Sequence, residues 1–118
     1  MLTELSQRSG IAESELGGLL ANCDASQTSM NFCAWRDQIV AERGLNRAVA
    51  DTVAQLPKCS GAIESKLTAW RWSRDTGCEK SATKDYGGGS MKPMVQAMCM
   101  QAETLKMAKR VTRMRGCK

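Results

Sequence analysis

The chain has 118 residues, a formal net charge of +5, six cysteines, no histidine and an aromatic content of only 4%. Without histidine the chain lacks the commonest general base and metal ligand, which excludes Ser-His or Cys-His catalysis and Cys/His zinc sites. We therefore expect no metal ion, no cofactor and no catalytic residue. No apolar run approaches the ~20 residues that a membrane span needs, so we also expect no membrane-spanning segment.

Residues 1–25 have a weak amphipathic pattern. Leu16, Leu19 and Leu20 have helical spacing, but Gly17 and Gly18 lie between them. We expect an N-terminal arm or a short helix here. The first residues lack the basic and apolar regions of a signal peptide, so we interpret the chain as a mature form whose leader was replaced by an initiating Met.

A first long helix is predicted over residues 28–56. Thr28 and Ser29 are acceptable N-caps, and Pro57 would end the helix. Its apolar residues recur at offsets of three and four beyond Gly44, which is typical of a buried helical face.

A second helix is predicted to begin near Ser60 and to end at Gly77, a residue suited to a left-handed helix end. Trp70 and Arg74 lie one turn apart on its inward face, where we expect a core tryptophan and a packed arginine that pairs with a carboxylate or caps a carbonyl near Cys78. We expect a structural role for Asp75 as well. Trp72 is about 200° from Trp70 around the helix. It should face solvent, where it could anchor a partner.

The polar stretch 79–90, which ends in three glycines, is predicted to be one long loop. An aromatic ring beside glycines and flexible polar residues is typical of a binding surface. The candidate binding residues are Lys80, Lys84, Asp85, Tyr86 and Ser90. The alternative is that Tyr86 folds back onto the bundle, and the acids of this stretch are expected to form surface salt bridges rather than catalytic pairs.

The last helix is predicted to begin at Ser90 with Pro93 in its first turn. Its inward stripe is expected to comprise Met94, Met98, Ala102, Leu105 and Ala108. From residue 100 onward there are six basic residues, Lys118 among them, and one acid. The basic patch of Lys109, Arg110, Arg113 and Arg115 is interpreted as a solvated face at a negative helix end, and without aromatic rings it does not predict nucleic-acid binding.

Six cysteines, Cys23, Cys33, Cys59, Cys78, Cys99 and Cys117, are spread along the chain without a CxxC pair. This pattern favours three disulfides and a periplasmic or secreted location over reduced cytosolic thiols. Six cysteines allow about fifteen pairings. We favour Cys78 with Cys99, because the Gly-rich loop between them would bring two helix ends together. The sequence therefore predicts an all-α, disulfide-crosslinked bundle of three main helices with a Gly-rich loop before the last one.

Several short motifs, in a fixed order, resemble the LprI-like lysozyme inhibitor family. They are Cys23 to Cys33 with Met30-Asn31 and Cys33-Ala34, then Ala41-Glu42, Leu45-Asn46, Trp70 with Arg74-Asp75 and Cys78, Gly88-Gly89-Ser90-Met91 with Pro93-Met94 and Cys99, and Thr104. The resemblance implies a small exported bacterial protein with lysozyme inhibition as its family activity. It also implies four family cysteines, with Cys59 and Cys117 as an added pair, and a helical domain over residues 26–118 that follows an arm over 1–25.

Together these features favour a protein that binds and inhibits a lysozyme-type or other peptidoglycan-degrading enzyme through protein contact. An immunity protein against a specific cell-wall toxin and a structural envelope protein without an enzyme target are the alternatives. An enzyme is the least supported class, because no His or metal set accompanies the acids. Eight methionines also leave open a homodimer formed through a Met-rich face.

Overall fold

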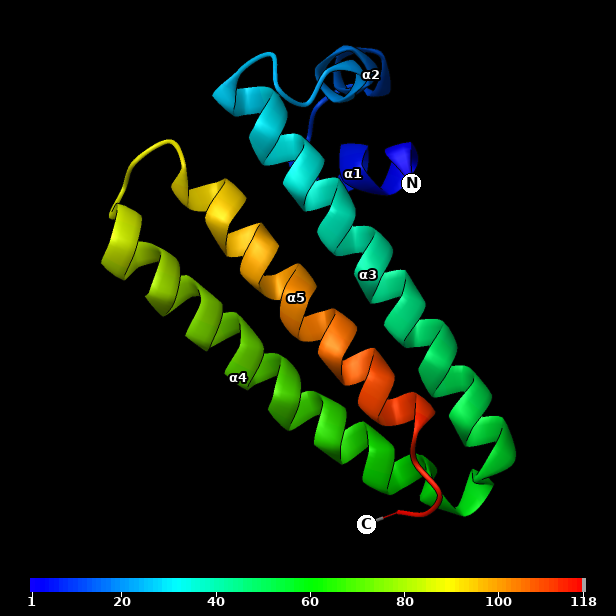
Figure 1. Cartoon of the computed structure of the whole chain (residues 1–118). Helices are drawn as coiled ribbons and strands as arrows, with labels where there is room; N and C mark the ends of the chain where they lie inside the picture. The colour runs from blue at the N-terminus through cyan, green and yellow to red at the C-terminus, as the bar shows by residue number, and fades with distance from the viewer. Residues whose placement is uncertain (118) are drawn as a thin grey trace.

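The computed structural model describes residues 1–117, and within them every regular element is helical. The elements are α1 (Leu2–Ser9), α2 (Glu13–Ala21), α3 (Gln27–Gln55), the short 3-10 helix η1 (Pro57–Cys59), α4 (Ser60–Tyr86) and α5 (Lys92–Thr112). The all-α prediction is confirmed, but there are five α-helices, because residues 1–25 form two short ones. α5 lies between α3 and α4, while α1 and α2 lie beside the N-terminal half of α3 (Figure 1).

The first long helix begins slightly earlier than predicted. Its N-cap is Ser26, whose Oγ accepts a hydrogen bond from the backbone N–H of Ser29 at 3.0 Å. Thr28 and Ser29, predicted as caps, are therefore inside the first turn. The helix ends at Gln55, because Pro57 starts η1 and cannot continue the α-helical hydrogen bonds.

The second long helix was predicted to end at Gly77, and this prediction was wrong. α4 continues to Tyr86, and the buried face that contains Arg74 continues through Cys78 and Ala82, each 1% exposed. A glycine inside a helix costs only about 1 kcal/mol relative to alanine. Burial of these two side chains and the disulfide of Cys78 offset that cost.

The last helix presents a different face to the core than predicted. Ala97, Thr104, Met107 and Val111 are its buried residues. Of the predicted inward stripe, Met94 and Ala108 are only partly buried, Ala102 is exposed, and Met98 and Leu105 are 53% and 48% exposed. α5 thus has two stripes of residues with helical spacing, the predicted one and the buried one. The Cys78–Cys99 bond to α4 and the packing against α3 place the buried stripe, which contains Met107, toward the core.

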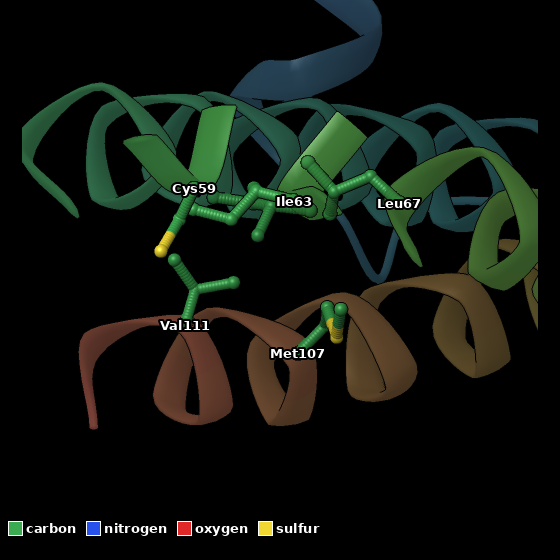
Figure 2. Packing of buried hydrophobic residues seen from close by; sticks show 6 residues of the cluster. Cys59, Ile63, Leu67, Met107 and Val111 are labelled. Atoms are coloured by element: carbon green, nitrogen blue, oxygen red, sulfur yellow. The ribbon is translucent and has the colours of Figure 1, made fainter. Parts of the chain in front are cut away.

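The main hydrophobic core, here called the basal cluster, lies where α3, α4 and α5 meet η1. Its buried members are Leu45, Cys59, Ile63, Leu67, Met107 and Val111 (Figure 2). Trp70 packs against it but is only partly buried, so it borders the core instead of filling it. A second group, the N-terminal cluster, consists of Leu5, Leu16 and Ile39 from α1, α2 and α3.

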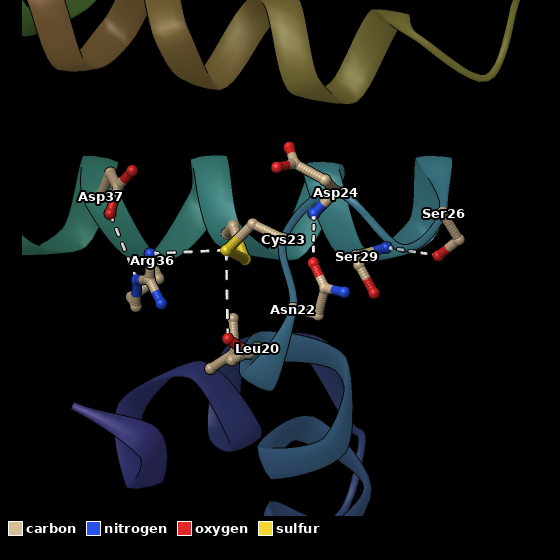
Figure 3. The surroundings of a disulfide bond; sticks show 9 residues. Leu20, Asn22, Cys23, Asp24, Ser26, Ser29, Arg36 and Asp37 are labelled. Carbon is tan, nitrogen blue, oxygen red and sulfur yellow. Dashed lines mark hydrogen bonds and ion pairs between the residues drawn. A yellow bond between two sulfur atoms is a disulfide. The ribbon is translucent and has the colours of Figure 1, made fainter.

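Three disulfides crosslink the bundle, and no cysteine is free. They join Cys23 to Cys33, Cys59 to Cys117 and Cys78 to Cys99. The favoured pairing of Cys78 with Cys99 is confirmed, as is the pair that the family resemblance implied for Cys59. The first disulfide ties the segment after α2 to α3, and Arg36 Nη2 lies 3.8 Å from Cys23 Sγ (Figure 3).

Candidate functional site

The turn between α4 and α5 forms one end of the bundle, here called the tip and defined as residues 84–92 (Figure 1). The backbone N–H of Gly87 donates to the carbonyl of Thr83 at 2.8 Å, and that of Gly89 donates to the carbonyl of Tyr86 at 3.0 Å. The side chain of Asn31 donates to the carbonyl of Ser90 at 3.0 Å. These bonds fix a short turn to α3, where a long loop had been predicted.

Two of the three glycines at the tip have definite backbone roles. Gly87 has φ 58°, a left-handed conformation that side chains with a Cβ rarely adopt. A Cβ on Gly89 would lie 3.1 Å from the carbonyl oxygen of Tyr86. The glycines therefore allow the chain to reverse within a few residues after α4.

The predicted binding residues lie mainly on a helix. Lys80, Lys84, Asp85 and Tyr86 occupy the last two turns of α4, and only Ser90 belongs to the turn. All five are exposed, Tyr86 by 41%. The loop prediction over 79–90 was wrong because residues 79–86 remain helical, which places these side chains on a fixed scaffold. Their role in binding stays a prediction.

An ion pair closes the base of the tip. Lys92 Nζ lies 3.2 Å from Glu79 Oε1, and the hydroxyl of Thr83 donates to the same oxygen at 3.1 Å. The hydrogen bond from Lys92 holds the pKa of Glu79 below its ordinary value of 4.5. This pair joins α4 to the first turn of α5, and Glu79 directly follows Cys78 of the Cys78–Cys99 disulfide.

The two tryptophans of α4 have different surroundings, as predicted from their spacing. Trp72 is 72% exposed, which makes it the most exposed large apolar side chain of the described residues. Trp70 borders the basal cluster, and the guanidinium carbon of Arg74 lies 5.0 Å from its ring centre. Trp72 is thus available to a partner, and Trp70 contributes to packing.

The basic patch is exposed at the C-terminal end of α5. Lys109, Arg110, Arg113 and Arg115 all face solvent, and none forms an ion pair with a described residue. Lys118, counted with this basic segment, lies outside the described residues. The cations near the end of α5 complement the negative end of the helix dipole.

Arg74 is the one charged residue among residues 1–117 that is buried. Its side chain is 5% exposed, and its Nη1 donates to Thr104 Oγ1 at 3.0 Å. Its Nε and Nη2 both lie 2.8 Å from Asp75 Oδ1, and its Nη1 is 3.7 Å from Glu42 Oε2. A buried guanidinium is tolerated only when it is paired and hydrogen-bonded in this way.

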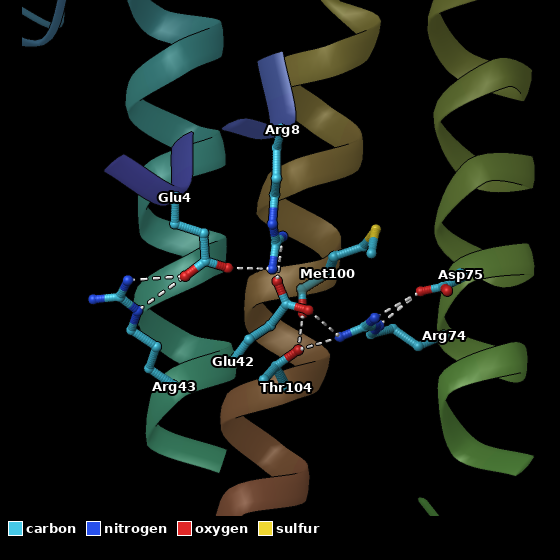
Figure 4. A network of polar contacts seen from close by, with 8 residues as sticks. All are labelled: Glu4, Arg8, Glu42, Arg43, Arg74, Asp75, Met100 and Thr104. Carbon is cyan, nitrogen blue, oxygen red and sulfur yellow. Dashed lines mark hydrogen bonds and ion pairs between the residues drawn. The ribbon is translucent and has the colours of Figure 1, made fainter. Parts of the chain in front are cut away.

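The contacts of Arg74 belong to a wider polar network that joins four helices (Figure 4). Arg8 Nη1 of α1 lies 3.2 Å from Glu42 Oε1, and Arg43 Nη2 of α3 lies 2.9 Å from Glu4 Oε1. The network contains equal numbers of carboxylates and guanidinium groups, so its charges balance. Its contacts connect α1, α3, α4 and α5 and therefore suit a structural role.

Residues from three of the family motifs meet in this network, namely Glu42, Arg74 and Thr104. We expected Arg74 to pair with a carboxylate, and it pairs with Asp75 and Glu42. Neither Thr104 nor Glu42 was predicted as a partner of Arg74, and Asn31 was not predicted as the anchor of the tip. In the sequence, these residues were connected only as members of the same ordered set of family motifs. They are too far apart along the chain to show the spacing of one helix face.

Within residues 1–117 no group of three or more His, Cys, Asp or Glu side chains could hold a metal ion. Among the same residues, no helix combines the length and apolar character needed to cross a bilayer. The exposed features that were also predicted from the sequence are the tip residues, Trp72 and the basic end of α5.

Comparison with known proteins gives one family assignment. No curated protein and no solved structure matches the chain. A family model described as "Lysozyme inhibitor LprI" matches residues 21–110, a span from the end of α2 to near the end of α5. The match includes the network residues Glu42, Arg74 and Thr104, the tip, and five of the six cysteines, all but Cys117. The chain therefore belongs to the LprI lysozyme inhibitor family.

Proposed function

We propose that the protein is exported and inhibits a lysozyme-type or other peptidoglycan-degrading enzyme by direct contact. The observation that carries this proposal is the family match over residues 21–110. Three disulfides in a small chain are typical of periplasmic and secreted proteins. The tip is the part of the molecule that we assign to the contact.

The chemistry of the tip suits the cleft of a glycoside hydrolase. Such clefts contain a pair of carboxylic acids. Lys84 of the tip and Lys80, one turn before it on α4, offer cations without an ion-pair partner among the described residues, and Tyr86 offers an exposed ring and hydroxyl. Because hydrogen bonds and the nearby Cys78–Cys99 disulfide already order the tip, little conformational entropy would be lost on binding.

The charge of the chain favours an acidic target. With a net charge of +5, encounter with a strongly cationic lysozyme would be slowed by repulsion, whereas an enzyme with an acidic surface would be attracted. The basic end of α5 would contribute to this long-range attraction and would make the association rate depend on salt.

The test is an inhibition assay against a panel of muramidases, lytic transglycosylases and amidases. Tyr86→Ala and Lys84→Ala should each weaken inhibition of a sensitive enzyme by about fivefold or more, as expected for central interface residues. The matched control is Lys109→Ala, which removes an exposed cation of the same type far from the tip. Both tip variants should retain the parental melting temperature. If they inhibit as well as the parent, the tip is not the contact surface, and if no enzyme of the panel is inhibited, the proposed activity fails.

A further inference from the structure

A groove between α4 and α5 lies on the side of the basal cluster and is separate from the tip. Its widest part has a volume of about 430 Å³ and is lined by Lys66, Trp70, Met107, Arg110, Val111 and Met114. The ring of Trp70 also lines the next hollow along the same two helices, beside Cys78 and Cys99. The groove therefore follows the helix pair on both sides of this ring.

The floor of the groove is apolar and can adapt to a ligand. Met107 and Val111 are 8% and 1% exposed, and Trp70 and Met114 are partly buried against the basal cluster. Methionine side chains are flexible and polarisable, so they accommodate apolar groups of different shape. A hollow of this size would accept one large apolar side chain.

The rim of the groove is cationic. Lys66 of α4 and Arg110 of α5 are both exposed, and neither has an ion-pair or hydrogen-bond partner among the side chains of residues 1–117. Two other cations of α5 are paired, since Lys92 contacts Glu79 and Lys106 contacts Glu103. Lys109, like Arg110, forms no ion pair with a described residue. No acid lines this hollow, so its charge is complementary to a carboxylate.

Disulfides hold the two helices together at the tip end of the groove and beyond its other end. Cys78 is bonded to Cys99 toward the tip, and Cys59 before α4 is bonded to Cys117 after α5. The groove is therefore formed before any ligand arrives, and a ligand would not need to separate or order the helices. Such preorganisation increases affinity because it lowers the entropy cost of binding.

We propose that this groove binds a protein segment that presents an apolar side chain next to carboxylates. The apolar group would enter the hollow of Trp70, Met107 and Met114, and the carboxylates would contact Lys66 and Arg110. A symmetric contact between the grooves of two copies fits poorly, because Glu103 is the only acid from residue 100 onward and like charges would meet. A flat bilayer surface would not reach the floor of the groove, where Met107 and Val111 are almost fully buried. The proposal does not depend on enzyme inhibition.

The test uses the intact, oxidised protein and a synthetic probe. The probe is an acetylated, amidated pentapeptide with leucine between two glutamates and a glycine at each end. The three tryptophans give three indole N–H signals in an NMR spectrum, which single Trp→Phe variants assign. We expect the probe to shift the Trp70 signal in a saturable way with a dissociation constant of about 1 mM or lower, while the Trp35 and Trp72 signals stay in place.

Matched controls separate this groove from general charge attraction. Lys66→Glu and Arg110→Glu should each weaken the probe by about three- to fivefold, the effect of an exposed ion pair, whereas Lys80→Glu makes the same charge change outside the groove and should have no such effect. Probes with glutamine for glutamate or serine for leucine should also bind more weakly. Equal weakening by all three charge reversals, or equal binding of the control peptides, would overturn the proposal. So would a Trp70 signal that responds only to protein concentration, which indicates self-association, or only to phosphatidylglycerol vesicles.

Discussion

The basal cluster and the N-terminal cluster are stabilised in different ways. The basal cluster buries six residues from α3, α4, α5 and η1, and one of them, Cys59, belongs to a disulfide. The N-terminal cluster buries three residues, and two of its helices have only eight and nine residues, too few to be stable alone. The family match starts at residue 21. The matched region thus contains its own core, and α1 with most of α2 is a cover over α3.

Polar contacts connect this cover to the rest of the bundle. Arg8 of α1 pairs with Glu42, which also faces Arg74, and Glu4 pairs with Arg43. Exposed ion pairs contribute at most about 1 kcal/mol each. The cover should therefore detach in local opening events that leave the basal cluster folded.

The largest expected effect comes from the disulfide of the basal cluster. Replacement of both Cys59 and Cys117 by Ala opens a loop of 58 residues, which should lower the free energy of unfolding by about 4 kcal/mol. Replacement of Cys23 and Cys33 opens a loop of 10 residues, with an expected loss of about 2.5 kcal/mol. Urea unfolding followed by circular dichroism measures both. A larger loss for the second pair would mean that the cover stabilises the core more than its size implies.

Cavity-forming substitutions should distinguish the two clusters directly. Leu67→Ala in the basal cluster should cost about 3 kcal/mol of global stability, a typical value for a fully buried leucine. Leu16→Ala should mainly release α1 and α2. Hydrogen exchange should then show fast exchange in these two helices and unchanged protection in α4 and α5. Loss of protection in all helices of the Leu16 variant would contradict the separation of the clusters.

The tryptophans of α4 test where the edge of the basal cluster lies. Trp70→Ala should cost about 2 kcal/mol, less than the 3 to 5 kcal/mol of a core tryptophan, because Trp70 is only partly buried. Trp72→Ala should change stability by less than about 0.5 kcal/mol, since 72% of this residue is exposed. Thermal unfolding of the two variants gives the comparison, and similar losses would require a second packing surface on α4.

The smallest expected effect is the pH dependence of the cover. Hydrogen bonding from Arg43 is the main cause that lowers the pKa of Glu4 below 4.5. A lowered pKa in the folded state adds stability above about pH 4.5, and this stability is lost as the pH falls through the lowered value. Acidification should therefore speed hydrogen exchange in α1 before it affects α4. Glu4→Gln should remove this pH dependence, while Glu79→Gln, on α4 and away from the cover, should leave the exchange of α1 as it is.

Much of the fold follows from local sequence signals. Pro57 ends the first long helix as predicted, and the Gly-rich turn brings Cys78 and Cys99 together. The end of α4 could not be predicted from local signals, because glycine often ends a helix. Here the helix continues past Gly77, since Cys78 and Ala82 are buried against the rest of the bundle. The buried face of α5 was also ambiguous, since the Met98 and Met107 stripes have the same periodicity and only tertiary contacts choose between them.

The candidate site was predicted only in part. Exposure of Trp72 followed from its angle to Trp70, and the exposed tip residues were identified by composition. The partners of Arg74 come from α3 and α5, and nothing in the local pattern of Arg74 indicates them. The groove near Lys66 and Arg110 depends on how two distant helices pack, so composition and periodicity contain no signal for it.

The disulfide connectivity has a consequence for how the chain acquires its structure. The Cys78–Cys99 bond is nested inside the Cys59–Cys117 bond. An oxidant that joins cysteines in the order in which they emerge from a translocation pore would therefore pair Cys59 with Cys78. Along α4 these residues would be about 28 Å apart at 1.5 Å per residue, whereas a disulfide needs Cα atoms within about 7 Å. Early formation of α4 would thus act as a spacer that blocks the wrong bond until Cys99 and Cys117 have emerged.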